Sequence, residues 1–424
     1  MTNLTMILPS YLKSLMQEVI AAGYECYLVG GAVRDYIINV ENKDYDLTTN
    51  MPLSKLKEML PALTIMKENS HRNTGVIRTN NYDIEFSSFR GTTLKEDLEN
   101  RDFKMNALAA TISGNIIDYV GGVEDIKNKK VSLVKESGEG LEQDPLRILR
   151  ALRQADKYNF KIDSNLKDQL LLKAHLLKNV SKERIYEELK KILLSDNIEY
   201  YLLEYKEIFF ELIPALRTCD GFDQHNKYHI YDVYTHIVKT VSKTDKNLYL
   251  RLAALFHDSG KPIKFTLDET NTGHFLHHSK ASLDIFKKFA KEYKLDNKTK
   301  KIVANLISYH EDTLSPRPAK IYDFYQKYDM DYIELLFALK EADIKSQNEE
   351  YLSRLKDLEL LKEKYLEVKT KYQKITYNGS ALIELGYTGK EIGTILKDLK
   401  REIIINKLEN DPTKINDYVL KKYS

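Results

Sequence analysis

The sequence predicts an α+β protein with a small mixed or antiparallel sheet near its start and helices in the rest of the chain. Short apolar runs bounded by turn residues, typical of strands, recur up to about residue 125. Beyond that point strand patterns nearly vanish, and helical spacing continues with few breaks. A chain of 424 residues is too long for one hydrophobic core, so we expect two to four domains.

The composition is that of a folded protein that works in water. Hydrophobic residues make up 42% and charged residues 30% of the chain, which argues against disorder. No apolar run approaches the roughly 20 residues that span a bilayer, so no membrane contact is expected. Two cysteines without metal-ligand spacing, Cys26 and Cys219, and a start unlike a signal peptide predict a cytoplasmic protein. The formal charge of +2 means that a nucleic acid would have to be held by a local basic face.

The first expected elements lead into the stretch on which the functional interpretation depends. Apolar residues at helical spacing predict a helix over residues 10–22, which Gly23 ends. Residues 24–29 suit a strand and residues 32–38 a helix, with Gly30-Gly31 between them. Backbone N–H groups at such a junction can point at a phosphate, with the positive end of the helix behind them.

Two aspartates follow this junction. Asp44 and Asp46 stand two residues apart, and residues i and i+2 of a strand lie on one face. They could therefore share one or two Mg²⁺ ions, which take carboxylate and phosphate oxygens. A lone Asp-x-Asp is usually a solvated turn, but its place after strand, Gly-Gly and helix favours a site that moves a nucleotidyl group. Glu85 could be a third carboxylate, although a solvent-facing strand position is the more ordinary interpretation.

The remaining pattern completes the expected order of elements. It predicts a helix over residues 54–60, strands over 74–78, 83–89 and 116–119, a turn at Asn80-Asn81, a helix over 146–155 with Pro145 in its first turn, and a long helix over 349–372.

Two downstream pairs of residues carry hydrogen-bonding chemistry. Asp102 and Asn106 are four apart, so on a helix they would share a face that could bond ribose hydroxyls. Asp144 and Arg147, three apart on a helix, offer an acceptor and a planar donor fork that could imitate the Watson–Crick edge of a base. The ordinary alternative for the second pair is an ion pair on a helix surface.

The segments LVGGAVRD (28–35) and DYDL (44–47) resemble the catalytic signature of the class II tRNA nucleotidyltransferase and bacterial poly(A) polymerase family. Four further segments resemble the family's motifs in the family's order. They are NRDFKMN (100–106) for ribose and triphosphate, the hinge segment at residues 118–126, QDPLR (143–147) for base selection, and SKERIYEEL (181–189) in the neck. The resemblance covers nearly the whole chain.

This resemblance implies an enzyme that adds CCA, or only CC, to tRNA 3′ ends from CTP and ATP without a nucleic-acid template. It implies catalysis by Asp44 and Asp46 with two Mg²⁺ ions, and release of pyrophosphate. It also implies nucleotide binding by Gly30, Gly31, Arg34, Arg101, Asp102, Asn106, Asp144, Arg147 and Arg150. A bacterial poly(A) polymerase is the nearest alternative by chemistry.

Three departures from the family pattern concern how nucleotides are chosen and held. Asn100 replaces the first arginine of the triphosphate motif, and Gln143 replaces the acid before Asp144. The flexible loop that CCA-adding relatives carry between the strand ending near Phe89 and the motif at Asn100 is missing. The branch of the family that adds only CC shows the same deletion, so CC-addition and CCA-addition both stay open.

A second set of residues resembles the HD superfamily of metal-dependent phosphohydrolases. The resemblance implies a metal site at His236, His257, Asp258 and Asp343. Imidazoles with carboxylates suit Mn²⁺, Fe or Ni, or Mg²⁺ with more water. His278 and His310 could add ligands or phosphate contacts, and Lys261 could neutralise a phosphate. The alternative function is therefore a phosphohydrolase acting on RNA 3′ ends or nucleotides, and a purely structural HD region is also compatible with the pattern.

Four domains are expected from these assignments. They are a nucleotidyltransferase head (1–125), a helical neck with the base-selecting motif (126–200), a helical body with the HD-type site (201–348) and a helical tail that binds tRNA (349–424). The Gly and Leu pattern of residues 379–396 resembles the family's tail. Lys390, Lys397, Lys400 and Arg401 could meet phosphates there, although an exposed lysine face is the ordinary interpretation.

Overall fold

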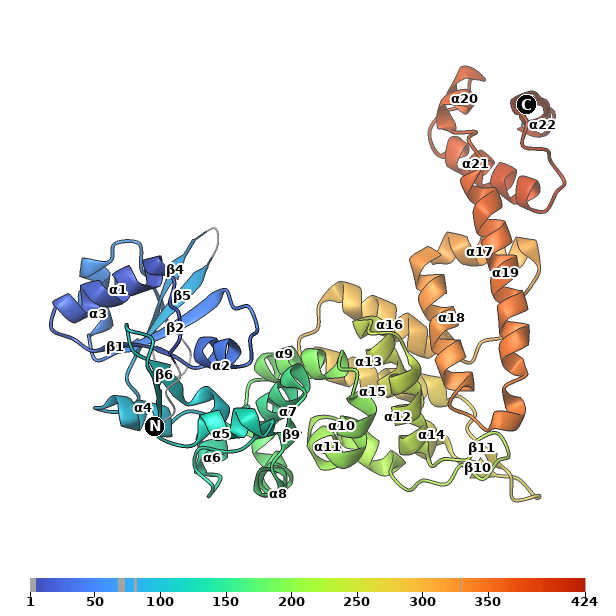
Figure 1. Cartoon of the computed structure of the whole chain (residues 1–424). Helices are drawn as coiled ribbons and strands as arrows, with labels where there is room; N and C mark the ends of the chain where they lie inside the picture. The colour runs from blue at the N-terminus through green and yellow to red at the C-terminus, as the bar shows by residue number, and fades with distance from the viewer. Residues whose placement is uncertain (1–4, 68–72, 80–81, 329, 424) are drawn as a thin grey trace. The chain divides into compact units, whose positions relative to one another are not determined.

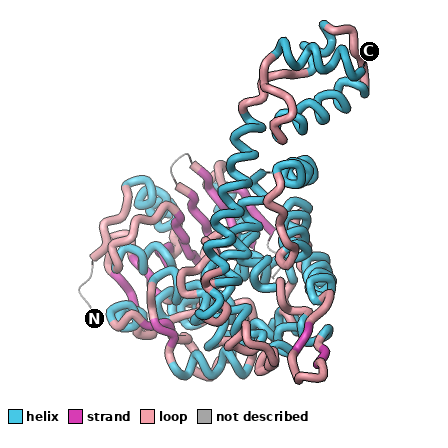
Figure 2. The backbone as a smooth tube through the Cα atoms, turned by 90° about the vertical axis from the view of Figure 1, so that its right-hand side faces the viewer, coloured by secondary structure: helices cyan, strands magenta, loops and turns pink. Residues whose placement is uncertain are grey.

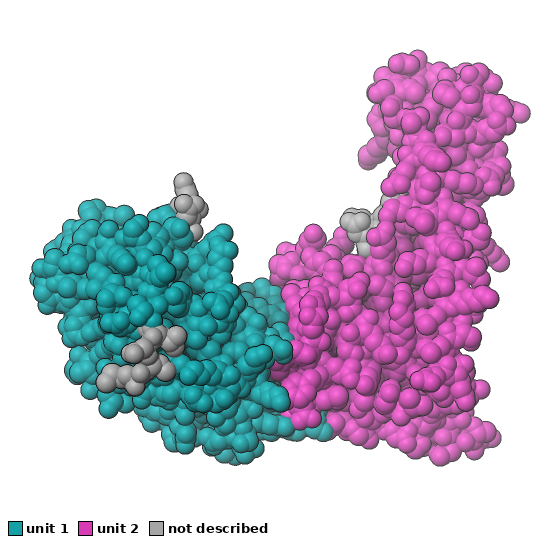
Figure 3. Space-filling view, in the orientation of Figure 1, with its two compact units in different colours: residues 1–192, 205–212 teal, residues 193–204, 213–424 magenta. Residues whose placement is uncertain are grey.

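The computed structural model describes residues 5–67, 73–79, 82–328 and 330–423. The chain folds into two compact units (Figure 3). Unit 1 holds Met1–Ile192 and Tyr205–Leu212, and unit 2 holds Leu193–Glu204 and Ile213–Ser424. One large group of strands lies among many helices (Figure 2), which confirms the predicted α+β class. Among the described residues, no helix combines the length and the apolar character that crossing a membrane requires.

Seven strands of unit 1 form a mixed sheet in the order β3-β4-β5-β2-β1-β6-β7 (Figure 1). Their bounds are β1 Cys26–Val29, β2 Asp44–Thr49, β3 Thr64–Lys67, β4 Asn73–Arg78, β5 Asp83–Ser88, β6 Leu108–Ala110 and β7 Ile116–Asp118. The β2–β5 pair is parallel, and the other described pairs of this sheet are antiparallel. The predicted small, mostly antiparallel sheet is therefore confirmed.

Two strands of this sheet have no strong signal in the sequence. β6 is Leu-Ala-Ala, and alanine is a poor strand former. Its three residues are buried and paired on both sides, with β1 and with β7, so tertiary context sets their conformation. β3 is an edge strand whose Ile65 and Met66 are exposed. The predicted turn at Asn80-Asn81 lies outside the described residues.

Helices of unit 1 surround the sheet and continue beyond it. They are α1 Ser10–Ala21, α2 Gly31–Ile37, α3 Leu53–Met59, α4 Leu94–Glu99, α5 Gly122–Lys127, α6 Glu139–Gln143, α7 Arg147–Tyr158, α8 Ser164–Leu172, α9 Lys182–Leu193 and α11 Lys206–Leu212, with 3₁₀ turns η1 Lys104–Asn106 and η2 Ala174–Asn179 and a short parallel pair, β8 Lys130–Val131 and β9 Lys161–Ile162. The helix expected over residues 146–155 begins at Arg147 and reaches Tyr158, so Pro145 precedes it instead of lying in its first turn.

The alternation along β2 decides which face carries the two aspartates. Tyr45 and Leu47 are buried, and the Tyr45 ring meets Tyr11 of α1 with ring centroids 6.1 Å apart. Because successive strand residues face opposite sides, Asp44 and Asp46 point away from α1. Pairing of β1 with β2 sets Val29 opposite Asp46, so the chain leaves β1 for α2 beside these carboxylates.

Unit 2 consists almost wholly of helices. They are α10 Ile198–Glu204, α12 Val233–Lys243, α13 Leu248–Phe256, α14 Lys261–Lys264, α15 His278–Glu292, α16 Asn297–Tyr309, α17 Pro318–Lys327, α18 Met330–Ile344, α19 Arg354–Gln373, α20 Gly379–Glu384, α21 Lys390–Ile404 and α22 Pro412–Tyr423, with 3₁₀ turns η3 Pro214–Cys219 and η4 Glu349–Tyr351 and a hairpin of β10 Thr266–Leu267 and β11 Gly273–His274. Helices α12, α13, α16 and α18 pack against one another, and α13 is buried from residue 250 to residue 256.

The long helix of unit 2 differs from the prediction at its start. Residues 349–351 form a 3₁₀ turn, and α19 begins only at Arg354. Its predicted apolar side is confirmed where Tyr365 and Val368 are buried. The helices after α19 have a small core of their own, formed by Tyr377, Leu382, Ile395, Leu399, Ile403, Ile415 and Val419.

A single carboxylate holds the turn between β7 and α5. Asp118 Oδ1 accepts the backbone N–H groups of Val120, Gly121 and Gly122 at 3.1, 2.8 and 3.0 Å, and Oδ2 accepts that of Val123 at 2.9 Å. Gly121 has φ +85°, which a side chain would strain. Asp118 thus satisfies the first N–H groups of α5, which have no partner within the helix.

We expect Asp118→Ala to lower the opening free energy of the β1, β6 and β7 amides by about 1–3 kcal/mol, because the N–H groups at the start of α5 lose their acceptor. Hydrogen exchange followed by mass spectrometry measures this directly. Asp118→Asn keeps one acceptor oxygen and should lose less, and Glu124→Gln, on the exposed side of α5, is the control. Equal protection in wild type and Asp118→Ala would contradict the assigned cap.

Candidate active site and metal centre

Gly30, which has no side chain, allows the Arg101 and Asp46 side chains to approach the backbone between β1 and α2. Its φ of +72° and ψ of −128° lie where residues with a side chain rarely fold. A Cβ on Gly30 would lie 3.1 Å from Arg101 Nη1 and 3.5 Å from Asp46 Oδ2. The predicted Gly-Gly junction is therefore present, and it brings the strand end, Arg101 and Asp46 together.

The Asp46 carboxylate has no partner within the described part of the protein. Its side chain opens onto solvent, and it makes no hydrogen bond or ion pair with any other residue that the structure describes. The surrounding protein desolvates the carboxylate and raises its pKa, an effect that the charge of Arg101 partly offsets. Asp44 is exposed on the same face, and Glu85 lies half-buried beside Asp46 in the parallel register of β2 and β5. The third-carboxylate alternative for Glu85 thus has the necessary placement.

Asp102 and Asn106 are in contact, although the predicted helix is wrong. The segment is extended at Phe103 and then forms the 3₁₀ turn η1. Asn106 Nδ2 donates to Asp102 Oδ1 over 3.0 Å, and Arg150 Nη2 donates to Asp102 Oδ2 over 2.7 Å. Arg34 Nη1 in turn donates to Asn106 Oδ1. A continuous chain, Arg34–Asn106–Asp102–Arg150, therefore joins α2, η1 and α7.

The charges in this chain are firmly fixed. Burial alone would raise the pKa of Asp102, but the charge of Arg150 and the hydrogen bonds from Asn106 and Arg150 outweigh it and hold the pKa below its usual range. Arg34 is buried, donates to Asp35 Oδ1 at 2.7 Å, and lies 4.2 Å above the Tyr158 ring centroid. These guanidinium groups cannot swing freely to meet a ligand.

Arg101 is held from the opposite direction. Its Nε and Nη2 donate to Asp97 Oδ2 at 3.2 and 2.9 Å, and the Arg90 backbone N–H donates to Asp97 Oδ1 at 2.9 Å. Asp97 is fully buried on α4. Asn100, where the family has arginine, uses its Nδ2 on the carbonyls of Arg90 and Glu96 at 3.0 and 2.9 Å. The Asn100 amide therefore holds the connection from Arg90 to α4 in place, where an arginine would offer a positive charge.

Asp144 and Arg147 are held by different partners, so their predicted common helix face is wrong. Asp144 precedes Pro145, and a residue before proline is pushed out of the helical region; its φ is −141° and its ψ is 91°. Arg147 donates to the backbone carbonyls of Asn100 and Arg101 at 3.2 and 3.5 Å. Asp144 Oδ1 instead lies 3.6 Å from Arg184 Nη2 of α9.

One cavity of about 720 Å³ in unit 1 collects most of the predicted nucleotide site. Its lining consists of Gly30, Gly31, Arg34, Asp46, Arg90, Asn100, Arg101, Asp102, Asn106, Gln143, Asp144, Arg147, Arg150, Gln154 and Arg184. Six arginines face three aspartates, so the cavity suits an anion of several charges. Asp44 is absent from this lining, and Gln143 turns its Nε2 to Glu139 Oε1 at 2.9 Å.

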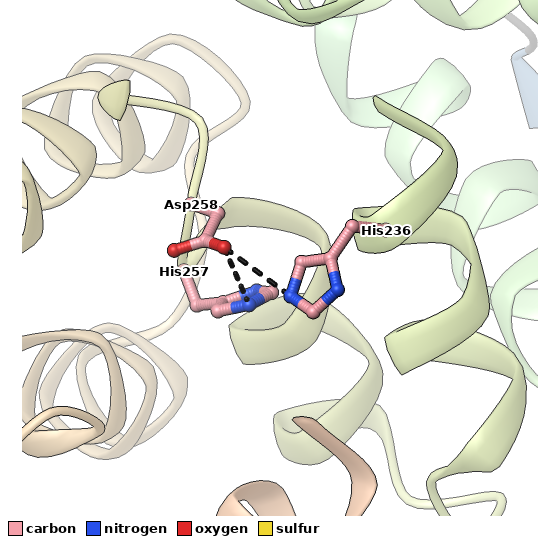
Figure 4. Close-up of side chains that lie close together, drawn as sticks. All are labelled: His236, His257 and Asp258. Atoms are coloured by element: carbon pink, nitrogen blue, oxygen red, sulfur yellow. Dashed lines mark ion pairs between the residues drawn. The ribbon is translucent and has the colours of Figure 1, made fainter. Parts of the chain in front are cut away.

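The HD residues of unit 2 also converge. His236 lies on α12, His257 and Asp258 directly follow α13, and Asp343 lies on α18. His236 Nε2 is 3.3 Å from Asp258 Oδ2 and 3.0 Å from Asp343 Oδ1. His257 Nε2 is 3.3 Å from Asp258 Oδ2 (Figure 4). His278 and His310 face the other oxygen of Asp258, and Lys261 Nζ is 2.7 Å from Oδ2.

These residues fit a divalent metal ion. The Nε2 atoms of His236 and His257 are buried, and neither has a hydrogen-bond partner among the described groups. Burial alone would lower the pKa of His236, but the carboxylates of Asp258 and Asp343 raise it to about 9. The charges of His257 and Lys261 likewise overcome burial and hold the pKa of Asp258 well below its usual range. The same imidazole nitrogens and carboxylate oxygens are ligand atoms that a divalent cation could bind in place of a proton.

Several site residues are missing from the sequence prediction. Asp97 pairs with Arg101 at the i,i+4 spacing of a helix, a local signal that could have identified it. Arg90 binds Asp97 through its backbone N–H, and Arg184 pairs with Asp144 on another element, so neither has a local signal. In unit 2, His229 and Lys340 line the cavity beside the HD cluster. Only Arg184 lies in a segment that the sequence singled out, so the family motif could have found it.

In the tail (349–424), two of the four basic residues predicted to contact phosphates lie near side chains of the protein itself. Arg401 Nε lies 3.8 Å from Asp323 Oδ1, and Lys400 Nζ lies 4.9 Å above the Tyr372 ring. Lys390 begins α21, and Lys397 is on the same helix. The tRNA contact of these residues stays a prediction.

Three known protein families match segments of the chain. The family described as "Poly A polymerase head domain" matches residues 26–132, "Probable RNA and SrmB- binding site of polymerase A" matches residues 159–218, and "HD domain" matches residues 227–347.

Relatives resemble the chain over nearly its whole length or over part of it. A CCA-adding enzyme of Lactococcus lactis subsp. lactis is 26% identical over 426 residues, 95% of each chain. A CC-adding tRNA nucleotidyltransferase of Shouchella clausii is 35% identical over 173 residues, 41% of this chain and 45% of the relative. The Bacillus stearothermophilus CCA-adding enzyme in complex with CTP has the same fold, with a TM-score of 0.65 and 21% identity over 98% of both chains. The Thermotoga maritima CCA-adding enzyme complexed with tRNA has a TM-score of 0.66 and 18% identity over 98% of this chain and 96% of that chain.

The fold and the sites together define a nucleotidyltransferase head joined to an HD domain, an architecture that implies dependence on divalent metal ions. The chain belongs to the family of class II tRNA nucleotidyltransferases and poly(A) polymerases.

We expect Asp102→Asn to lower the stability of unit 1 at pH 7 by about 1–3 kcal/mol, because Arg150 loses its charged partner. The folded-state pKa of Asp102 is depressed, so its stabilisation is present above the unfolded pKa of about 3.9 and is lost as pH falls below it. The difference between the variant and wild type should therefore shrink below about pH 4.

Hydrogen exchange of unit 1 peptides at pH 7, or thermal unfolding between pH 7 and pH 3, measures this effect. The control is Asp168→Asn on the exposed side of α8, which should leave the pH profile unchanged. A gap between Asp102→Asn and wild type that is constant over this range would contradict the assignment.

Proposed function

We propose that this protein is a template-independent tRNA nucleotidyltransferase that adds C, and in the full reaction A, to tRNA 3′ ends from CTP and ATP. The observation that carries the proposal is the single 720 Å³ cavity, which joins the glycine junction, Asp46, and the ribose and base-selecting motifs. Relatives of the same length are named CCA-adding enzymes, and solved structures of the same fold hold CTP, ATP or tRNA.

The reaction would be attack of the tRNA 3′-hydroxyl on the α-phosphorus of the nucleotide, which forms a phosphodiester bond and releases pyrophosphate. Two Mg²⁺ ions held by Asp44 and Asp46 would supply acidification of the hydroxyl and charge for the leaving group. Arg101, which is fixed by Asp97, would place positive charge against the triphosphate. The carboxylate of Asp46, which has no partner among the described residues and whose pKa is raised by burial, supports this role.

Ribose recognition falls to Asn106 more than to Asp102. A carboxylate accepts about four hydrogen bonds, and Asp102 already accepts from the Phe103 N–H, from Asn106, and twice from Arg150. Asn106 keeps one N–H and one lone pair. We therefore assign to Asp102 the positioning of Asn106 and Arg150, and to Asn106 the direct contact with a ribose hydroxyl.

Base selection would use Asp144 and Arg147, as the family resemblance implies. Both side chains line the cavity, and Arg184 lies beside Asp144. The acid that the family has before Asp144 is Gln143 here, and its amide pairs with Glu139. Arg147 is instead oriented by the carbonyls of Asn100 and Arg101, which supply the support that the missing acid would give.

Addition that stops at CC is the second form of this function, favoured by the connection between β5 and α4. Residues 89–93 make this link, and their hydrogen bonds close it tightly. The Phe89 N–H donates to the Thr49 carbonyl, while the Thr92 N–H and hydroxyl both donate to Glu96 Oε2. Thr93 caps α4 through Glu96 N–H. This link is too short and too fully hydrogen-bonded to act as the flexible loop that switches the pocket from C to A.

An HD-type phosphohydrolase acting on RNA 3′ ends or nucleotides is the candidate from another class. The cluster of buried His236, His257 and Asp258 with the partly buried Asp343 favours it. The metal proposed there is Mn²⁺, Ni²⁺ or Fe. The two candidates occupy different units, so one chain can carry both.

We expect Asp44→Ala combined with Asp46→Ala to reduce nucleotide addition by at least about 10³-fold, because the ions lose their anchoring carboxylates. Binding of tRNA, measured by filter retention, should persist. Glu124→Gln, an exposed carboxylate on α5, is the matched control for addition. Near-normal extension by the double variant would overturn the proposal.

Product length separates the forms of the reaction. We expect tRNA that lacks its 3′ CCA to gain two residues with CTP, and tRNA ending in CC to gain none with ATP if the short link limits the pocket. Denaturing gels that resolve single nucleotides measure this. Addition of A to tRNA-CC would establish CCA-addition, long A tails would indicate a poly(A) polymerase, and phosphate release without extension would favour the phosphohydrolase.

A further inference from the structure

Helix α7 directs a row of polar side chains toward the cavity of unit 1. Arg147, Arg150 and Gln154 of this helix all line the cavity. Residues three, four and seven positions apart share one face of a helix, so these three follow one another along α7. Tyr158, four residues further on, continues the row and contacts Arg34 of α2. The row therefore runs from the segment expected to select the base to the helix after the glycine junction.

Gln154 is the member of this row that has no partner among the described residues. The two arginines of α7 donate to acceptors of the protein, and the Tyr158 hydroxyl accepts from a third arginine. Gln154 is only 6% exposed, and its Oε1 is buried without a hydrogen-bond partner in the described structure. A buried amide in this state costs folding free energy that an apolar side chain of the same size would avoid. Such a cost at the wall of a cavity points to a role in binding a ligand.

The chemistry of the amide indicates which ligand group it would bind. Glutamine offers an acceptor oxygen and a donor NH₂ group, and its last torsion is soft enough to present either one to the cavity. A phosphate oxygen can only accept, and six arginines of the lining supply the positive charge that it needs. A ribose hydroxyl can both donate and accept, so it complements either orientation of the amide.

The place of Gln154 in the row agrees with a ribose. Arg150, one helical turn before Gln154, binds Asp102, and Asp102 binds Asn106, to which we assign a contact with a ribose hydroxyl. Side chains four positions apart on a helix are only about 5–6 Å apart at their Cβ atoms. We propose that Gln154 is a further specificity-determining residue of this cavity, whose amide hydrogen-bonds a ribose 2′-hydroxyl and so favours ribonucleotides over deoxyribonucleotides.

This inference rests on the proposed nucleotide addition, in which two riboses enter the cavity. One belongs to the incoming CTP or ATP, and the other belongs to the RNA end that carries the attacking 3′-hydroxyl. Both sugars have a 2′-hydroxyl, so replacing each hydroxyl by hydrogen in turn identifies the sugar that Gln154 contacts. The replacement leaves the base and the phosphates unchanged, so it tests the ribose contact alone.

The experiment compares the full chain with its Gln154→Met variant, because methionine has nearly the same length and lacks the amide. For the nucleotide, kcat/KM is measured with CTP and with dCTP on tRNA that lacks its 3′ CCA. For the RNA end, kcat/KM is measured with CTP on the same tRNA and on one whose last residue is 2′-deoxy. We expect Gln154→Met to lower one of these two ribose-to-deoxyribose ratios about three- to tenfold, the effect of losing one neutral hydrogen bond.

The ratio that falls identifies the sugar. A weaker preference for CTP over dCTP would assign the hydroxyl to the nucleotide, and a weaker preference for the ribose-ended tRNA would assign it to the RNA end. Two ratios equal to those of the wild type would overturn the proposal. Gln17→Met is the matched control, because Gln17 is an exposed glutamine of α1 outside the cavity lining, and it should keep both ratios.

Thermal unfolding checks the unpartnered state of the amide itself. Gln154→Met should unfold at a temperature no lower than that of the wild type, because the amide has no hydrogen bond within the described protein to lose. A marked loss of stability would show that the protein itself holds the amide, and it would overturn the proposal.

Binding measurements separate this proposal from the proposed reaction. Calorimetric titration of CTP and dCTP, and of the two tRNAs, requires no turnover. The ratio that falls in kcat/KM should also fall in the affinities of Gln154→Met. A wild-type chain that shows the ribose preference in binding, and loses it in Gln154→Met, but extends no tRNA would contradict the proposed transfer reaction and would still support the role of Gln154.

Discussion

The organisation of unit 1 depends on the chain of hydrogen bonds and charges from Arg34 through Asn106 and Asp102 to Arg150. It links the helix after the glycine junction with the turn before β6 and with α7, the helix that begins at Arg147. Because the chain is largely buried, removing one member leaves the others with unmet charge, which costs more than an exposed ion pair contributes. The side chains that line the cavity are therefore ordered without a ligand, and binding a ligand should cost little conformational entropy.

In unit 2 the site side chains are also held by the protein itself, here through hydrogen bonds between histidines and backbone carbonyls. Backbone carbonyls at the ends of α13 and α16, and at Phe275, hold the Nδ1 atoms of His257, His310 and His278. Tight packing of α12, α13, α16 and α18 then sets the distances between the inward Nε2 atoms. The helix ends fix ring orientation, and the helix packing fixes ring position.

The sequence predicted those features that depend on local period. The alternation of β2 placed Asp44 and Asp46 on one face, and the spacing of Asp102 and Asn106 predicted their contact, since a 3₁₀ turn spans nearly the same distance as a helical one. The prediction from helical spacing was wrong for Asp144, because the following Pro145 forces this residue out of the helical conformation. Motif resemblance identified the residues of the HD cluster, but no spacing rule shows that residues over a hundred positions apart meet. The pairing of Asp144 with Arg184 likewise has no local pattern.

The cavity of unit 1 and the cavity of unit 2 differ in the source of their positive charge. The head cavity is lined by six arginines against three aspartates, and several of these arginines are already paired within the protein, so under the proposed function a triphosphate would enter a prepared positive surface. The HD cavity differs: imidazole nitrogens gather around the Asp258 carboxylate, and its lining carries several carboxylates beside Lys261, Lys340 and Arg354. A phosphate would thus be bound by protein charge in one unit and by metal charge in the other. Anion affinity should accordingly depend on metal supply much more strongly in unit 2 than in unit 1.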